Sequence, residues 1–186
     1  MDKWDKRFLR LARTISSWSK DESTQVGAVI VRPDKTIASV GFNGFPKTMP
    51  DKEELYKNRD EKYSRIIHAE MNAALFSHDE SLNGYTLYTY PMMSCERCFV
   101  HMVQLGITRF VYPEAEQRHL IRWSESFERV KQYAKECNVT LVSYSKDEFV
   151  DIKDQIIEAA LKFRNGLELH ESGLHELLEK YINEIE

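Results

Sequence analysis

The sequence predicts an α/β protein built as a three-layer α/β/α sandwich. Short apolar runs typical of strands alternate with segments that have the three- and four-residue periodicity of helices. Glycine and proline residues punctuate this alternation at several junctions. Such an order is typical of a sheet with helices on both faces, and 186 residues, of which 42% are hydrophobic, are enough to build its core.

The elements can be placed along the chain from local patterns. An apolar stripe rich in aromatic residues runs from Trp4 to Trp18 at helical spacing, and we expect it to lie in the core. Pro33-Asp34 indicates a hairpin, and Gly106 is placed to end a helix. The predicted strands are residues 25–32, 36–41, 85–90, 108–112 and 139–144, and the predicted helices are residues 4–20, 68–76, 94–105 and 119–136.

The segment 42–66 is polar and rich in turn residues, and we expect a loop there. A loop of this length inside a compact domain is usually functional, and this one ends beside His68, so it should border the active site. Asn43 lies between two glycines and could be a simple turn former. Its position at a strand end favours a contact with substrate.

Two short motifs supply a possible metal site. Cys95 and Cys98 are three residues apart, so both sulfurs can face one ion from the first turn of a helix opened by Ser94, where the helix dipole favours thiolates. His68 and Glu70 are two residues apart, roughly 200° around a helix, and cannot share one side of it. They can meet beyond its N-terminal end, which we therefore place at the metal.

Three protein ligands leave one tetrahedral position open, which is typical of a catalytic zinc. A zinc-bound water ionises near pH 7, and Glu70 is placed to carry its proton to a ring nitrogen and a leaving amine. The pair of motifs matches the H-x-E and P-C-x-x-C signature of zinc deaminases, except that Pro91 lies four residues before Cys95. The predicted chemistry is hydrolytic deamination.

Two other interpretations of these residues remain open. A structural zinc knuckle would need a fourth ligand, such as His78, His101 or Cys137, and would leave Glu70 without a role. Unligated core cysteines are disfavoured by the paired spacing with a histidine upstream. We expect Cys137 to be a buried packing residue and His101 to be solvated or at the edge of the core.

Composition narrows the class of partner. A net charge of −4 gives no basic field for a nucleic-acid polymer, so a small molecule is the expected partner. Three cysteines, two of them in the proposed metal site, favour a reducing compartment. We find neither a signal-like start nor an apolar run of membrane-spanning length, so we expect a cytoplasmic protein without a membrane partner.

The chain divides in this interpretation into a catalytic domain, residues 1–144, and an extension, residues 145–186. The extension is acidic, begins with a capping box formed by Ser145 and Glu148, and continues with apolar residues at helical spacing. We expect a helical hairpin that covers either its own core or another subunit.

Over residues 4–144 the sequence resembles the deoxycytidylate deaminases of the cytidine deaminase superfamily. The resemblance rests on the cysteine pair and on four further segments, residues 19–21, 25–31, 41–46 (Gly-Phe-Asn-Gly-Phe-Pro) and 68–73 (His-Ala-Glu-Met-Asn-Ala). It implies a five-stranded mixed sheet, conversion of dCMP to dUMP with release of ammonia, and a homo-oligomer.

The resemblance also implies roles for individual residues. One zinc per chain would be held by His68, Cys95 and Cys98, with Glu70 as proton shuttle and Asn43 on the sugar. The residues beside the matching motifs that suit a phosphate chemically are Lys20, Ser23, Thr24 and Lys47.

Two departures from the family pattern bear on these expectations. Segment 46–66 contains neither cysteine nor histidine, so the second zinc of some relatives is not expected. Ser94 stands where the family usually has proline, which alters the pocket wall. The alternatives are therefore a deaminase of another base, nucleoside or modified pyrimidine and, from a different class, a non-catalytic zinc-stabilised interaction module.

Overall fold

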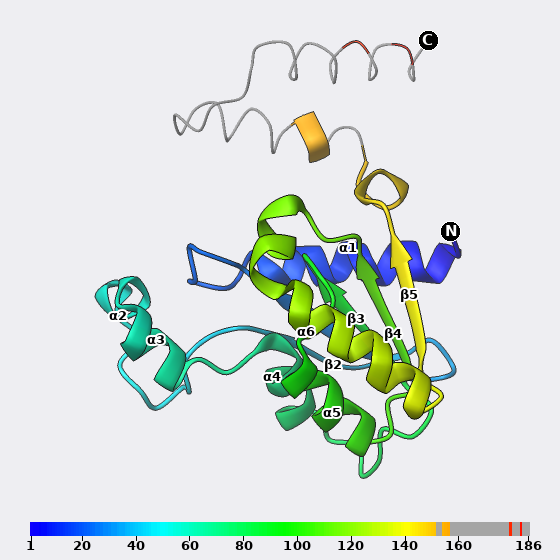
Figure 1. Ribbon diagram of the computed structural model, residues 1–186, viewed down its shortest axis with the longest axis horizontal. Coiled ribbons are helices and arrows are strands. Elements are labelled where there is room, and N and C mark those ends of the chain that lie inside the picture. The colour runs from blue at the N-terminus through cyan, green and yellow to red at the C-terminus, as the bar shows by residue number, and fades with distance from the viewer. Residues whose placement is uncertain (152–153, 157–178, 180–182, 184–186) are drawn as a thin grey trace. The chain divides into compact units, whose positions relative to one another are not determined.

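A computed structural model describes residues 1–151, 154–156, 179 and 183, and it has the predicted sandwich architecture (Figure 1). Single strands and helices alternate from residue 86 to residue 144. The elements are α1 (Lys3–Ser16), β1 (Gly27–Val31), β2 (Ile37–Phe42), α2 (Glu53–Lys57), α3 (Arg59–Arg65), α4 (Ala69–Leu75), β3 (Thr86–Tyr90), α5 (Glu96–Gln104), β4 (Arg109–Pro113), α6 (Gln117–Glu136) and β5 (Thr140–Tyr144).

The five strands form one mixed sheet in the order β2-β1-β3-β4-β5. Strand β1 pairs antiparallel with both β2 and β3, whereas β3, β4 and β5 run parallel. The parallel half places the carboxyl ends of its strands at one edge of the sheet, where ligands of α/β proteins commonly bind. The predicted fold class is confirmed.

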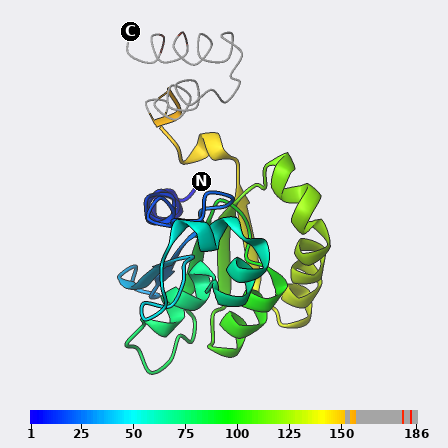
Figure 2. The ribbon, with the colours of Figure 1, turned by 90° about the vertical axis from the view of Figure 1, so that its left-hand side faces the viewer.

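The helices cover both faces of the sheet. Helix α1 packs on one face, and α4, α5 and α6 lie on the other (Figure 2). Strand β1 is buried on both, as its apolar sequence predicts. Two glycines let helices lie directly on strands: a Cβ on Gly27 would be 2.1 Å from the carbonyl oxygen of Ala12 in α1, and one on Gly41 would be 2.3 Å from the amide nitrogen of Ala73 in α4.

Three sequence-based expectations about single residues and boundaries are wrong. Helix α1 ends at Ser16, so Trp18 lies beyond it, 54% exposed, with its ring edge-on to Phe42. Cys137 follows α6 as its C-cap and is exposed, because it lies outside the helix face that packs on the sheet. Helix α5 begins at Glu96 with Cys95, not Ser94, as its N-cap.

Segment 42–66 is not a continuous loop, because it contains the short helices α2 and α3. Asn58 separates them and caps α3, its side-chain oxygen accepting from the amides of Asp60 and Glu61. Tyr56 of α2 stacks on Phe45 with ring centroids 4.2 Å apart, which anchors the pair of helices to the chain ahead of them.

The chain divides into two compact units, Met1–Ser145 and Lys146–Glu186. In the second unit, Lys146–Glu148 forms a 3₁₀ turn and residues 154–156 are helical. The predicted helical hairpin falls almost entirely on residues outside those described. Over the described part of the chain, every helix is too short or too polar to cross a membrane.

Candidate active site

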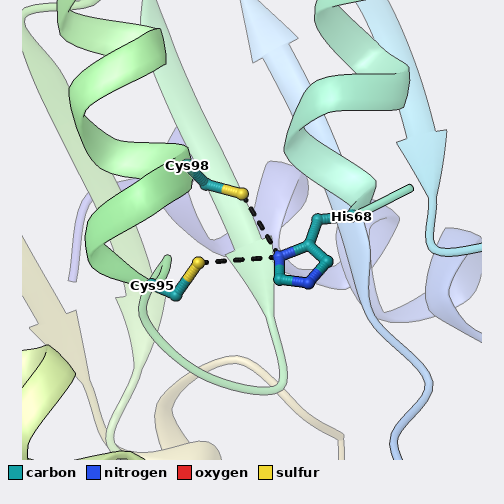
Figure 3. A group of neighbouring side chains, drawn as sticks. All are labelled: His68, Cys95 and Cys98. Carbon is teal, nitrogen blue, oxygen red and sulfur yellow. Dashed lines mark hydrogen bonds between the residues drawn. The ribbon is translucent and has the colours of Figure 1, made fainter. Parts of the chain in front are cut away.

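One histidine and two cysteines converge between the starts of helices α4 and α5. The Nδ1 atom of His68 lies 3.5 Å from Sγ of Cys95 and 3.3 Å from Sγ of Cys98 (Figure 3). The three ligand atoms all lie within 4.8 Å of one another. The sequence-predicted ligand set is therefore assembled in space.

The local conformation explains why these side chains meet. His68 and Cys95 are the N-cap residues of their helices, both with extended backbone, and neither side chain caps its own helix. Their donor atoms are therefore free to point away from the helix ends toward each other. A two-residue β-bridge between Gly44 and Ile67 fixes the backbone just before His68.

Hydrogen bonds within the cluster favour a thiolate. The bond from Cys98, and then that from His68, lowers the pKa of Cys95 to about 4, and the bond with Cys95 raises the pKa of His68 to about 9. The bond with Cys95 and burial both raise the pKa of the Cys98 thiol. The thiolate is the form of cysteine that binds metals.

The cluster fits a zinc ion by the chemistry of its donors. One imidazole nitrogen and two sulfurs are ligands that zinc prefers, and three protein ligands leave one position for water or substrate. Within the described part of the chain, no other histidine, cysteine or carboxylate joins the cluster, so none of His78, His101 and Cys137 completes a closed knuckle. Three ligands with one open position are typical of a catalytic rather than a structural zinc.

Glu70 lies in the first turn of α4, two residues after His68, and is only 4% exposed. It lines the same pocket as His68 and Cys95. Burial, and then the nearby Cys95 sulfur, raises the pKa of its carboxyl group above the usual value. A carboxyl group of this kind can hold and release a proton beside a reacting molecule.

Asn43 lines this pocket, but its amide already makes hydrogen bonds to the backbone. Its Oδ1 accepts from the amide of Val26 at 2.7 Å, and its Nδ2 donates to the carbonyl oxygen of Thr24 at 3.0 Å. Asn43 therefore fixes the segment that precedes β1 against the end of β2. Its predicted contact with a sugar stays a prediction.

The four residues predicted to suit a phosphate separate into two groups. Ser23 and Thr24 line the pocket. Lys20 and Lys47 do not: the ammonium of Lys20 pairs with Asp51 at 2.6 Å, and that of Lys47 lies 5.0 Å from the ring centroid of Phe76. Their predicted phosphate contacts remain untested.

Several pocket residues were not predicted from the sequence. Lys62 and Tyr63 come from α3, and Arg122, Trp123 and Phe127 come from α6. The prediction that segment 42–66 borders the site points to the region of Lys62 and Tyr63, but not to these two residues in particular. The α6 residues carry no local motif, and only the packing of α6 beside the cysteine helix brings them to the pocket.

Comparisons with known proteins agree with this site. The sequence profile of the family described as "Cytidine and deoxycytidylate deaminase zinc-binding region" matches residues 2–114. An uncharacterized deaminase encoded in the luxG 3′ region of Aliivibrio fischeri is 40% identical over 128 residues, which are 69% of this chain and 84% of that protein.

A probable deoxycytidylate deaminase of Caenorhabditis elegans is 35% identical over 122 residues, covering 64% of this chain and 61% of that protein, so this relative is matched over less than two thirds of its length. Among solved structures, the dCMP deaminase of cyanophage S-TIM5 in complex with dCMP and dUMP superposes with a TM-score of 0.61 at 21% identity, covering 77% of this chain and 99% of that one. At this identity the structural match supports the fold.

Proposed function

Because the chain belongs to the cytidine and deoxycytidylate deaminase family, we propose that it is a zinc-dependent hydrolase that converts dCMP to dUMP and ammonia. The observation that carries this proposal is the three-ligand cluster of His68, Cys95 and Cys98 with the buried carboxyl group of Glu70 in the same pocket. Relatives and a structural neighbour whose names or complexes include deoxycytidylate support the substrate.

His68 Nδ1 and the sulfurs of Cys95 and Cys98 would hold the metal. Zinc bound there supplies a water molecule that ionises near neutral pH. Glu70 then acts on protons: its carboxylate accepts one from the attacking water and delivers it to N3 of the cytosine ring. It accepts the second proton of that water and passes it to the departing amino group, which leaves as ammonia while C4 becomes a carbonyl.

Apolar side chains form part of the pocket wall beside Glu70. Met92 and Met93 from the loop before the cysteines are almost fully buried, and both line the pocket with Phe127 of α6. A low-dielectric wall strengthens the electrostatic interactions of Glu70 with a bound base.

The proposal includes one zinc ion per chain, a homo-oligomeric state and a cytoplasmic location. Leu75 and Phe76 at the end of α4 are 63% and 50% exposed, which supports a covered surface in an assembly. A nucleotide substrate and metal-binding thiols fit a reducing compartment. Metal analysis and sedimentation of the purified protein would measure the first two.

The experiment that tests the function is ammonia release from dCMP, CMP, dCTP and deoxycytidine offered in parallel. Treatment with a strong chelator should abolish turnover, and zinc should restore it. A Cys98→Ser variant should lose metal affinity by more than the roughly 10- to 100-fold typical of losing an outer-shell partner. Turnover of none of the four compounds by zinc-loaded protein would contradict the proposal.

A further inference from the structure

The mouth of the active-site pocket opens into a second, larger cavity. The inner pocket has a volume of about 70 Å³ and the outer one about 570 Å³. Five residues line both, so the two cavities adjoin each other; they are Asp21, Ser23, Lys62, Tyr63 and Arg122. A molecule whose ring lies beside Glu70 can therefore reach the side chains that the two cavities share.

The outer cavity is lined by four cations, two of which already have acidic partners. Lys62 is 6% exposed and pairs with Asp21 at 3.1 Å, while its ammonium also lies 2.5 Å from Oγ of Ser23. Lys57 pairs with Glu53 within α2. These two lysines add little uncompensated charge, because each carboxylate neutralises its partner.

Arg59 and Arg122 are different, because within the described residues neither makes an ion pair. Instead, both guanidinium groups lie on the ring of Tyr63, with Cζ 5.3 Å and 5.6 Å from its centroid. Tyr63 is 43% exposed, at the junction of the two cavities. The same ring also lies 5.5 Å from the ammonium of Lys62, so Tyr63 contacts both arginines and the paired lysine at the mouth.

We propose that Arg122, with Arg59 beside it, binds the 5′-phosphate of the substrate and makes the enzyme selective for nucleotides over nucleosides, and that Tyr63 positions both guanidinium groups. This inference rests on the proposed function. A phosphate monoester carries nearly two negative charges at pH 7, and a guanidinium group can donate two parallel hydrogen bonds to it. Glu22 is the remaining acid of the outer cavity, and it lies next to Asp21 rather than on either arginine's helix.

The geometry favours Arg122 over the lysines expected from the sequence. Arg122 lines the inner pocket together with His68, Glu70 and Cys95, so one ligand in that pocket can contact both groups. Arg122 also lies outside the segment matched by the family profile, which ends at residue 114. The phosphate contact we assign therefore comes from helix α6, beyond the matched segment.

The test compares nucleotide with nucleoside. Arg122→Gln should raise KM for dCMP about 10- to 100-fold, because one charge-assisted interaction is lost, and should change kcat/KM for deoxycytidine by a much smaller factor. Arg59→Gln should act in the same direction with a smaller effect. Tyr63→Ala should raise KM for dCMP, and Tyr63→Phe, which keeps the ring, should restore it.

Arg118→Gln is the matched control. Arg118 is on the same helix, pairs with Glu116 at 2.9 Å and lines neither cavity, so its loss removes the same charge without touching the mouth. Equal effects of Arg122→Gln and Arg118→Gln on dCMP would overturn the inference. Parallel effects of Arg122→Gln on dCMP and deoxycytidine would overturn it as well.

Calorimetric binding of dUMP and deoxyuridine separates this inference from the proposed function. Arg122→Gln should weaken dUMP binding about 10- to 100-fold and leave deoxyuridine binding unchanged. This result in a protein that deaminates no cytosine compound would support the phosphate site and refute the deaminase. Deamination that is equally efficient with dCMP and deoxycytidine would support the deaminase and refute the phosphate site.

Discussion

Asp5 and Glu70 are both buried carboxyl groups, 2% and 4% exposed, but their surroundings are opposite. Asp5 in α1 accepts two hydrogen bonds from Arg109 at 2.9 and 2.7 Å, one from Tyr88 at 2.7 Å and one from Tyr144 at 2.8 Å. Glu70 in α4 lies near Cys95, His68 and Ser94 and lines a pocket together with Met92 and Met93.

The pKa values of the two carboxyl groups move in opposite directions. Burial alone would raise the pKa of Asp5, but the hydrogen bonds from Arg109, Tyr88 and Tyr144 outweigh it and lower the pKa below 3.8. Burial raises the pKa of Glu70. A buried acid whose acceptor sites are all satisfied stabilises a fold, whereas one that is left ready to exchange a proton can catalyse.

The largest expected effect is a loss of activity when Glu70, but not Asp5, is replaced. Glu70→Gln should lower kcat for dCMP by at least about 10²- to 10⁴-fold, because the proton carrier is removed, while zinc content stays at the wild-type level. Steady-state kinetics and metal analysis check this. Glu54→Gln, an exposed change on α2, is the control. Retention of more than a tenth of the wild-type kcat would refute the assigned role of Glu70.

The second prediction is that replacing Asp5 lowers the stability of the fold and leaves activity intact. Asp5→Asn should lower the free energy of unfolding by about 3 kcal/mol, because the partly buried guanidinium of Arg109 loses its counter-charge. Urea unfolding measures the change. The variant should keep the wild-type kcat at temperatures where it is folded. A loss of kcat as large as that of Glu70→Gln would contradict the structural role assigned to Asp5.

The third prediction concerns pH. Because the folded-state pKa of Asp5 is lower than its ordinary value of 3.8, the stability that it contributes is fully present above that value and is lost as the pH falls through the folded-state pKa. The difference in unfolding free energy between wild type and Asp5→Asn should therefore be constant at neutral pH and shrink below 3.8. A difference that begins to shrink well above 3.8 would contradict the assigned network.

The smallest effect comes from one donor to Asp5. Tyr144→Phe should cost about 1 kcal/mol of unfolding free energy, since Oδ2 of Asp5 still accepts from Arg109. Urea unfolding beside the Asp5→Asn variant gives both values on one scale. In the double variant, Tyr144→Phe should add little, because its partner has already changed.

The sequence was sufficient for the features that depend on local spacing. The alternation of strands and helices predicts the layers, and the motifs around His68 and the cysteine pair predict a cluster that the structure assembles. His68 and Cys95 are the N-cap residues of their helices, and this position determines where their side chains point. The short motifs around them are therefore enough to predict most of the metal-site geometry.

The rest depends on contacts between distant segments. Arg122 and Tyr63 meet only because α6 and α3 border the same pocket, and no local pattern in either helix indicates this. In the sequence, Asp5 is an acidic residue in the first turn of a helix, which is a common position for an acid. Its partner Arg109 is 104 residues away along the chain, so their ion pair cannot be predicted from local sequence. Proximity to a motif predicts a phosphate contact for Lys20 but not its ion pair with Asp51, which is 31 residues further along the chain.

Gly41 has a consequence for how this enzyme can diverge. A side chain there would collide with the backbone of α4 at Ala69 and Ala73. Helix α4 therefore packs directly on β2 at this point, with no side chain of Gly41 between them. The opposite wall, formed by side chains of α3 and α6, has no such restriction. We expect laboratory evolution toward new substrates to accumulate changes on the α3 and α6 wall and to leave the metal-bearing half nearly invariant.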